Sequence, residues 1–286
     1  MKIAVTGTTG FVGSAFVAHL RNSSFDVRAI DRGSEFSFEG TEAVIHIAGL
    51  AHQSGRLQPT TEEFDAANHQ FTRKLAARAA EAGVKRFVFL SSVNVVAGNE
   101  GILSPEMPFN PLSEYGQSKA RAELALREYE QIEPVILRPP LVYGPHPKGN
   151  MATLLRMASS PLPLPFASVD NRRTMISISN LVEAIEFATI TEGLAGRVFH
   201  VTDGRDISLK EMIATIRAAR GQPERLFPVP PKVLEALLGI LGKRKIAEQL
   251  LGDLIVDGSL LNRAGWLPRH DPSQGLQAMA VAEQDS

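Results

Sequence analysis

The sequence predicts an α/β protein, in which a doubly wound parallel sheet is followed by a smaller, discontinuous α/β lobe at the C-terminal end. Two observations predict the sheet. Short apolar runs alternate with helical segments from residue 1 to about residue 140, and a glycine-rich turn joins the first run to the first helical segment. The alternation loosens after Tyr143, where five prolines fall between residues 145 and 165. We therefore expect one domain over residues 1–143 and a second lobe made mainly of residues 144–286.

Each strand is predicted from a short apolar run that is bounded by turn or helix signals. The first run, for example, ends at Gly7. The last run, near residues 197–202, is expected to return to the first sheet. The expected strands are Ile3–Val5, Val27–Ile30, Ala43–Ile47, Phe87–Leu90, Val135–Leu137 and Val198–Val201.

Helices are predicted from apolar residues at helical spacing together with capping residues. Ser113 is a candidate N-cap, and Ser208 with Glu211 forms the capping-box pattern. The expected helices are Phe11–Leu20, Thr61–Ala82, Glu114–Tyr129, a segment capped by Asn180 that runs through Ile190, a segment after Ser208 and a helical tail after Pro231.

The composition excludes several classes of protein. The 286 residues include 30 basic and 31 acidic side chains, so neither a nucleic-acid partner nor an acidic disordered tail is expected. The absence of cysteine excludes a disulfide scaffold, a thiolate metal site and a thiol nucleophile. Near the end, the longest apolar run, Val233–Leu241, is about half the length of a membrane span. A signal peptide is an alternative interpretation of residues 2–18, but glycine, serine and threonine interrupt that stretch. We expect a cytoplasmic protein with no bound metal and no membrane partner.

The segment Thr6–Gly13 lies between the first strand and the first helix. Glycines there permit a tight turn and a close approach of the backbone to a pyrophosphate, and the helix N-terminus presents free N–H groups to that anion. A left-handed turn alone would also select glycine, but the position between strand and helix favours a dinucleotide site in a Rossmann-type sheet. The residues expected to contact the cofactor here are Gly7, Thr9, Gly10, Phe11, Val12 and Gly13.

Asp31 ends the second expected strand, 18 residues after Gly13. An acidic side chain at this point accepts hydrogen bonds from the adenosine ribose and repels a 2′-phosphate, which favours NAD over NADP. Two alternatives stay open. Asp31 could be a turn residue, and Arg32 could accommodate the phosphate of NADP.

Tyr115 is the only one of three tyrosines that has a lysine, Lys119, four residues later. Residues four apart share a helix face, so we expect the ammonium to lower the pKa of Tyr115 from its usual value of about 10. Tyr115 would then be the general acid/base of an alcohol–ketone interconversion; the alternative is a solvated surface pair. Ser91 and Ser92 follow an expected strand at the edge where such sheets bind ligands, and a hydroxyl there could bind the reacting oxygen or simply form a turn.

Together these motifs resemble the extended short-chain dehydrogenases/reductases, and more closely their NAD-dependent epimerase/dehydratase branch, which acts on nucleotide sugars. The resemblance covers nearly the whole chain and weakens after about residue 205. The later motifs are similar to those of enzymes that act at C4 of UDP-linked N-acetylhexoses, including UDP-glucose 4-epimerase-like proteins and the 4-keto reductases of O-antigen pathways. The motifs are Thr6–Gly13, Asp31, His46–Gly49, Asn68, Ser91–Ser92, Tyr115 with Lys119, Arg138–Pro140, Leu141–Pro145, Lys148–Asn150 and Asn171–Arg173.

The resemblance implies a role for each site residue. Ala48 and Gly49 would line the NAD site, as would Asp31, Arg32 and the glycine turn. Ser92 would hold the sugar oxygen, Tyr115 would move the proton, and Lys119 would bind the nicotinamide ribose and tune Tyr115. Asn150 and Arg173 would contact the nucleotide diphosphate, since a guanidinium presents a planar fork of donors. Arg172 and Arg173 could instead be a solvated surface pair.

The resemblance also implies a homodimer through the helices near residues 61–82 and 114–130, although the alanine-rich stretches there fit a monomer equally well. Two departures from the family pattern stand out. Ten residues separate Arg32 from Ala43, where the family usually has a helix, a third strand and an acidic adenine contact, so this strand should be shortened or vestigial, with Glu39 as a candidate substitute. Val93 and Asn94 also stand where family 4,6-dehydratases carry Asp-Glu.

The sequence therefore predicts an NAD-dependent epimerase, or a 4-dehydrogenase or 4-keto reductase, that acts at C4 of a UDP-sugar. An NADP(H)-dependent reductase of a non-nucleotide carbonyl is a second enzymatic interpretation, against which Arg173 argues. A cofactor-sensing regulatory or scaffold protein is an alternative of another class. Proteins of that class usually lack the tyrosine–lysine pair, so Tyr115 and Lys119 discriminate between the two.

Overall fold

The computed structural model describes residues 1–33, 35–51, 59–147, 149–242 and 244–283. Contacts divide the chain into two compact units, and the chain passes between them several times. The first unit comprises Met1–Pro140, Ile178–Val201 and Val256–Leu267, and the second comprises Leu141–Ser177, Thr202–Ile255 and Pro268–Ser286. Residues 178–201 and 256–267 therefore belong to the first unit, whereas the sequence assigned only the strand near residues 197–202 to it.

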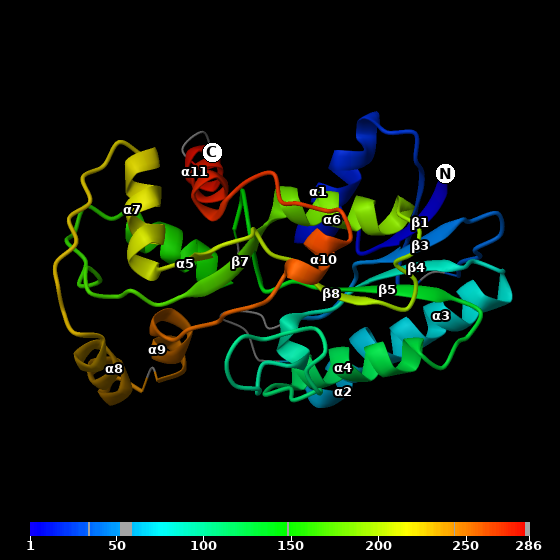
Figure 1. The fold of residues 1–286 in the computed structure, drawn as a ribbon, viewed down its shortest axis with the longest axis horizontal. Helices are drawn as coiled ribbons and strands as arrows, with labels where there is room; N and C mark the ends of the chain where they lie inside the picture. The colour runs from blue at the N-terminus through cyan, green and yellow to red at the C-terminus, as the bar shows by residue number, and fades with distance from the viewer. Residues whose placement is uncertain (34, 52–58, 148, 243, 284–286) are drawn as a thin grey trace. The chain divides into compact units, whose positions relative to one another are not determined.

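The first unit contains a six-stranded parallel sheet, as the sequence predicts (Figure 1). Strand β1 lies inside the sheet, and its residues Ile3, Ala4 and Val5 are fully buried because both faces of the sheet are covered. From β1 the chain passes to one side to form β2 and then to the other side to form β3, and such a reversal creates a ligand-binding position. In spatial order the strands are β2 (Asp26–Ile30), β1 (Lys2–Thr6), β3 (Ala43–His46), β4 (Arg86–Leu90), β5 (Glu133–Arg138) and β8 (Val198–His200).

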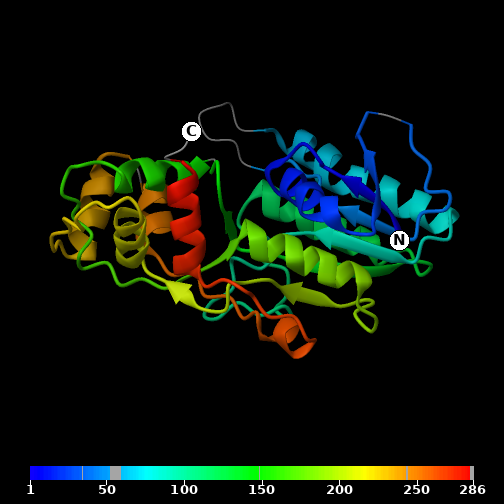
Figure 2. The same ribbon diagram turned by 90° about the horizontal axis from the view of Figure 1, so that it is seen from above.

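Helices cover both faces of this sheet (Figures 1 and 2). Helix α1 (Phe11–His19) packs beside α6 (Ile178–Ile190) on one face, and α3 (Phe71–Glu81) packs beside α4 (Glu114–Leu126) on the other. The shorter helices of this unit are η1 (Leu20–Asn22), α2 (Thr61–Phe64), η2 (Asp65–Gln70), η3 (Val93–Val95) and α10 (Ser259–Arg263).

The helix expected over Thr61–Ala82 is not regular. It begins as α2, which Thr60 caps in a reciprocal capping box with Glu63. It then widens into the π-helical turn η2 and continues as α3. Such π turns occur frequently at functional sites, and Asn68 lies inside this one.

Two capping expectations change in the structure. Helix α6 begins at Ile178, so Asn180 lies inside its first turn and is buried instead of capping it. Ser208 does cap α7 (Leu209–Ala219) by accepting a hydrogen bond from the Glu211 N–H at 3.1 Å. The Glu211 carboxylate is instead paired with Arg205 at 2.8 Å, so only half of the expected capping box forms.

The second unit has its own sheet and core, in agreement with the expected smaller lobe. Strands β6 (Leu141–Tyr143) and β7 (Arg173–Ser177) are parallel, and β9 (Asp206–Ile207) joins β7 in the antiparallel sense. Helix α11 (Pro272–Ala282) packs beside α7 (Figure 2). The other helices are α5 (Gly149–Ala158), α8 (Pro231–Ile240) and α9 (Arg244–Leu251). No helix among the described residues of the chain is long and apolar enough to cross a membrane.

Candidate functional site

The glycine turn between β1 and α1 is packed so closely that larger residues cannot replace two of its glycines. Gly7 has a φ of +74°, and a Cβ there would lie 2.7 Å from the Cα of Ala48. A Cβ at Gly13 would lie 2.0 Å from the carbonyl oxygen of Gly7. Gly10 is the exposed N-cap residue of α1, so a phosphate can approach the free N–H groups of the first helical turn.

A chain of buried hydrogen bonds connects this turn to the start of α3. The Thr72 hydroxyl donates to the carbonyl oxygen of Asn68 at 2.5 Å, so it accepts at its 2.9 Å contact with His46 Nε2. Burial, with a smaller contribution from nearby cations, lowers the pKa of His46 well below its usual value, so the imidazole is neutral. Its Nδ1 therefore accepts from the Thr6 hydroxyl at 2.7 Å, and Thr6 Oγ1 accepts from the Ala48 N–H at 3.1 Å. Each hydrogen bond of this series therefore has a defined donor, and the series ties the glycine turn and the turn after β3 to the start of α3.

Asn68 continues this network toward α4. Its Oδ1 accepts from the Leu50 N–H at 2.7 Å, and its Nδ2 donates to the Leu50 carbonyl at 2.9 Å and to Ser118 Oγ at 2.8 Å. The Ser118 hydroxyl in turn donates to the carbonyl oxygen of Tyr115 at 2.8 Å. Ser113 caps α4 as predicted, since its side chain accepts from the Gly116 N–H at 3.1 Å. The segment after β3 and the helix that carries Tyr115 are thus held by the same amide.

The region after β2 is short, as expected. No strand is present between β2 and β3 in the part that the structure describes, and Phe38 is buried there. Asp31 follows β2 directly and is exposed, and Glu39 is also exposed. The guanidinium carbon of Arg32 lies 5.5 Å from the centre of the Phe71 ring, a cation–π contact at the start of α3.

The two serines after β4 have different surroundings. The Ser91 hydroxyl donates to Glu123 Oε1 at 2.5 Å, and Arg138 forms a two-pronged ion pair with the same carboxylate at 2.9 and 2.6 Å. The Ser91 hydroxyl is therefore already engaged with the buried Glu123–Arg138 ion pair. Ser92 instead forms a side-chain hydrogen bond with Tyr115 and also accepts from the Asn94 N–H at 3.2 Å. The structure thus singles out Ser92 as the hydroxyl beside the tyrosine, as the resemblance implies.

The Tyr115 pKa shift is opposite to the sequence-based expectation. Burial raises the pKa of Tyr115, and the hydrogen bond from Ser92 only partly opposes this rise. The Lys119 ammonium donates to the Leu90 carbonyl at 2.9 Å and lies 4.7 Å from the centre of the Phe89 ring. Burial also lowers the pKa of Lys119 to about 7. The prediction that Lys119 lowers the pKa of Tyr115 is therefore wrong for this structure. The Lys119 side chain donates to the carbonyl at the end of β4, and with a pKa of about 7 it is only partly charged near neutral pH.

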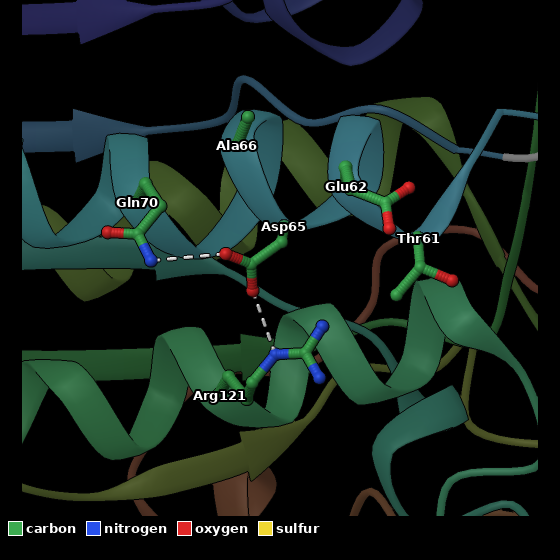
Figure 3. Close-up of a pocket in the computed structure, with 6 residues that line it drawn as sticks. All are labelled: Thr61, Glu62, Asp65, Ala66, Gln70 and Arg121. Carbon is green, nitrogen blue, oxygen red and sulfur yellow. Dashed lines mark hydrogen bonds and ion pairs between the residues drawn. The ribbon is translucent and has the colours of Figure 1, made fainter.

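A cavity of about 410 Å³ lies between α2, η2 and α4 (Figure 3). The Asp65 carboxylate pairs with Arg121 at 3.0 Å and accepts from Gln70 at 3.1 Å. Neither Tyr115 nor Lys119 lines this cavity. It belongs to the helices for which the resemblance implies dimer contacts, and it is lined by Thr61, Glu62, Asp65, Ala66, Gln70 and Arg121.

The residues expected to contact a diphosphate lie in the second unit, near the end of α9. Arg173 donates to the Gly252 carbonyl at 2.9 Å, and Asn150 donates to Gln249 at 3.0 Å. Arg172 is 60% exposed and pairs with Asp206 at 2.7 Å. Arg173 forms no ion pair within 4 Å among the described residues; burial lowers its pKa, and the Asp253 carboxylate opposes this shift.

Comparison with known proteins is consistent with this geometry. The family model described as the NAD dependent epimerase/dehydratase family matches residues 3–201. A UDP-glucose 4-epimerase from Vibrio cholerae is 34% identical, over 98% of this chain and 95% of its own length. The chain belongs to the NAD-dependent epimerase/dehydratase family. Membership confirms the resemblance stated above and makes the protein an enzyme with NAD as its cofactor.

More distant relatives extend the comparison. An N-acetyl-alpha-D-glucosaminyl-diphospho-ditrans,octacis-undecaprenol 4-epimerase from Escherichia coli is 23% identical over 96% of this chain and 93% of its own length. A UDP-glucuronic acid 4-epimerase from Bacillus cereus, solved in complex with NAD, has a TM-score of 0.79 at 20% identity and covers 100% of this chain and 99% of its own. This structural likeness shows that the fold is shared.

The first unit of this family member has a cradle that fits NAD. Gly7 and Gly13 have no room for a Cβ, which allows the turn to be tight. Gly10 has no side chain to cover the start of α1, so a pyrophosphate can reach the N–H groups there. At Gly49 an added Cβ would lie 3.0 Å from the Lys119 ammonium, so that turn and the lysine face each other directly.

Glu123 and Thr72 also contribute to this site, although neither was among the residues predicted for it. Glu123 lies four residues after Lys119, which lies four residues after Tyr115, so all three share one face of α4. That repeat was a readable signal. Thr72 carries no local signal, because only the contact with His46 across the fold gives it a role.

Proposed function

We propose that this enzyme oxidises and reduces C4 of a UDP-linked N-acetylhexose with NAD as the hydride carrier. The arrangement of Ser92, Tyr115 and Lys119 carries the proposal, since the three lie together where β4 ends and the Lys119 ammonium faces Gly49. The names of the Vibrio and Escherichia relatives, both 4-epimerases, support C4 as the reacting position. The N-acetylglucosaminyl group in the second name supports the N-acetylhexose.

In this proposal each residue has one task. Tyr115 takes the proton of the C4 hydroxyl when the sugar is oxidised and returns it when the ketone is reduced. Bound NAD supplies the acceptor and the donor of the hydride at that carbon. The Ser92 hydroxyl holds the reacting oxygen within reach of the phenol. One N–H of the Lys119 ammonium donates to the Leu90 carbonyl, and its other N–H groups would bind a ribose hydroxyl of the cofactor.

The cofactor and the diphosphate are assigned to separate sets of residues. The NAD site would comprise the glycine turn from Gly7 to Gly13, Asp31, Arg32, Ala48 and Gly49, together with Tyr115 and Lys119. Arg173 and Asn150 would bind the diphosphate of the substrate. Arg173 forms no ion pair within 4 Å among the described residues, although the Asp253 carboxylate acts on it electrostatically. This supports the role, because such a guanidinium can bind a phosphate without first breaking a direct ion pair. The name of the Escherichia relative places its sugar on undecaprenyl diphosphate, so a polyprenyl diphosphate is a second carrier to compare with UDP.

Net reduction of a 4-keto sugar is a second candidate, and one observation favours it. Because burial raises the pKa of Tyr115, the phenol is its resting form. The phenol is the form that donates a proton to a ketone, whereas oxidation requires the phenolate. A reductase needs only this half of the cycle, and an epimerase needs both.

The test uses the purified enzyme with NAD and a panel of UDP-hexoses, with product configuration read by NMR and nicotinamide absorbance recorded in parallel. The same enzyme is assayed with NADH and a UDP-4-keto sugar. Tyr115→Phe should lower turnover by about 10²–10⁴-fold, the usual contribution of general acid/base catalysis. Tyr129→Phe, which changes another tyrosine of the first unit, should retain activity.

Two results would contradict the proposal. One is near-normal turnover by Tyr115→Phe on the true substrate. The other is activity on simple ketones with none on any nucleotide or polyprenyl diphosphate sugar, which would favour the reductase of a non-nucleotide carbonyl.

A further inference from the structure

The short helix α2 and the π turn η2 lie along α4, the helix that carries the proposed acid/base. Asp65 of η2 pairs with Arg121 of α4 at 3.0 Å, and Figure 3 shows the two side chains directed at each other. Three residues later, Asn68 donates to the Ser118 hydroxyl of α4 at 2.8 Å. These two polar contacts hold Thr61–Gln70, called the α2–η2 segment below, against α4.

A third contact of the α2–η2 segment reaches the Tyr115 side chain itself. The ring of Phe64, the last residue of α2, lies 6.3 Å from the Tyr115 ring, with an interplanar angle of 54°. This separation falls in the range of favourable aromatic pairs, about 4.5–7 Å between ring centres. Phe64 is 1% exposed, so packing holds it on all sides. One side of the Tyr115 ring therefore faces a fixed apolar ring.

Hydrogen bonds at the two ends of Tyr115 do not set the plane of its ring. Ser92 bonds to the phenol oxygen, and Ser118 donates to the backbone carbonyl at 2.8 Å. Rotation of the ring about its Cβ–Cγ bond moves neither of these oxygen atoms. Conjugation keeps the phenolic O–H in the plane of the ring, so this plane decides the direction in which the proton is given or taken. Packing of the Phe64 ring against the Tyr115 ring acts on the plane itself.

A capping box holds Phe64 at this place. The Thr60 hydroxyl accepts from the Glu63 N–H at 3.2 Å, and the Glu63 carboxylate accepts from the Thr60 N–H at 2.8 Å. Helix α2 has only four residues, and so short a helix has little stability of its own. Its direction, and with it the place of Phe64, therefore depends on the cap. Both capping residues are exposed, so the cap can be removed without opening the core.

We propose that Phe64 is a positioning residue: its ring holds the Tyr115 phenol in the plane that directs the O–H at the reacting oxygen of the substrate. The inference rests on the proposed function and adds to it a residue that acts only through the Tyr115 hydroxyl. Since the cofactor and the diphosphate are assigned to other residues, Phe64 affects the rate of the chemical step and leaves binding unchanged.

The experiment compares the wild-type enzyme with Phe64→Leu, which keeps an apolar side chain but removes the ring. The substrate is the UDP-hexose of the panel that the wild type turns over fastest, with NAD as cofactor. Turnover (kcat) should fall about 10- to 100-fold, because a misplacement of about 1 Å at a reacting group can cost that much. KM for the sugar and Kd for NAD should stay within about twofold of the wild-type values.

Phe16→Leu is the matched control. Phe16 is also 1% exposed, but it lies on α1, which covers the face of the sheet opposite to α4. The substitution removes the same ring from the interior of the same unit and should leave kcat within about twofold of the wild-type value. Circular dichroism, together with urea unfolding followed by the fluorescence of Trp266, establishes that each variant is folded.

A double-mutant cycle separates positioning from a general structural effect. In the Tyr115→Phe background no hydroxyl remains to be directed, so adding Phe64→Leu should lower the residual turnover less than about threefold. A merely structural role would lower turnover by the same factor in both backgrounds. Thr60→Ala removes the cap without touching the core and should lower kcat several-fold, whereas Thr61→Ala, which changes the neighbouring exposed threonine, should not.

The inference fails on any of three results. The first is a folded Phe64→Leu variant whose kcat is near the wild-type value or no lower than that of Phe16→Leu. The second is an equal loss when Phe64→Leu is added to Tyr115→Phe. If Phe64→Leu does not fold, Thr60→Ala decides, and an unchanged kcat in that variant is the third. Near-normal turnover of Tyr115→Phe would instead contradict the proposed function itself.

Discussion

Replacing Glu123 with glutamine should strongly destabilise the first unit. Glu123 is fully buried, and Arg138, which it pairs with through both carboxylate oxygens, is 2% exposed. The substitution keeps the volume of the side chain but removes its charge. The guanidinium of Arg138 is then left without a counter-charge in the interior, and the hydroxyl of Ser91 loses its charged acceptor.

The magnitude follows from this burial. Removing one member of a buried ion pair costs about 3–5 kcal/mol, because the other charge stays buried without compensation. Replacing both Glu123 and Arg138 with methionine removes both charges together, so this double variant should lose less stability than the sum of Glu123→Met and Arg138→Met. We expect the coupling free energy of this double-mutant cycle to be at least ~2 kcal/mol.

Urea unfolding followed by tryptophan fluorescence measures the loss of stability of the first unit, which contains this ion pair. The chain has one tryptophan, Trp266, which is 6% exposed and lies in the first unit. For a slope of ~2 kcal/mol/M, the Glu123→Gln midpoint should fall by about 1.5–2.5 M. Glu81→Gln is the control, since Glu81 forms an exposed pair with Arg78 at 3.2 Å and should change stability by less than about 0.5 kcal/mol. A Glu123→Gln midpoint within the range of this control, or single effects that simply add in the double variant, would refute the reasoning.

Three further predictions concern binding, pH and reaction type. Arg173→Ala should weaken UDP binding about 10- to 100-fold, the equivalent of a charged hydrogen bond, and leave NAD binding unchanged; equal effects of Arg172→Ala in calorimetry would contradict the choice between the two arginines. Burial, then the Arg138 charge, lowers the pKa of His200 to about 4, whereas the unfolded value is about 6.5. The unfolded chain therefore binds a proton that the folded chain does not, and stability should fall as pH drops from 6.5 to 4, by up to about 1.4 kcal/mol per pH unit. Urea unfolding at several pH values should show a smaller fall in His200→Gln. No 4,6-dehydration is expected, because Val93 is buried and has no titratable group and the Asn94 amide does not titrate near neutrality, so neither can act as an acid or a base; a product of UDP-GlcNAc that is one water lighter in the mass spectrum would contradict this.

The sheet could be predicted from the sequence because its signals are local. The apolar run Ile3–Val5 is buried on both faces and needs no knowledge of its neighbours to be identified as a strand. The steric limit at Gly13 is equally local, since it comes from the Gly7 carbonyl oxygen within the same turn, whereas the limit at Gly7 comes from Ala48 in a distant segment. The cap at Ser113 belongs to the same class.

The features that the sequence did not reveal depend on contacts between distant segments. The π turn around Asn68 coincides with side-chain hydrogen bonds to Leu50 and Ser118, which lie 18 and 50 residues away. The distinction between Ser91 and Ser92 depends on Glu123, which approaches only when α4 packs on the sheet. Adjacent residues of identical type offer no local means of assigning these roles.

The pKa of Tyr115 shows the same limit at the centre of the proposed chemistry. Spacing of four residues places Lys119 on the face of Tyr115, but the spacing does not say where the ammonium points. In the structure it donates to Leu90, and burial acts against the charged form of each side chain separately, raising the pKa of Tyr115 and lowering that of Lys119. A phenolate beside an ammonium is neutral as a pair, so burial penalises that pair less than either charge alone. The proton of Tyr115 would then become available when a shared partner brings its oxygen and the Lys119 ammonium together, and helical proximity alone would not suffice.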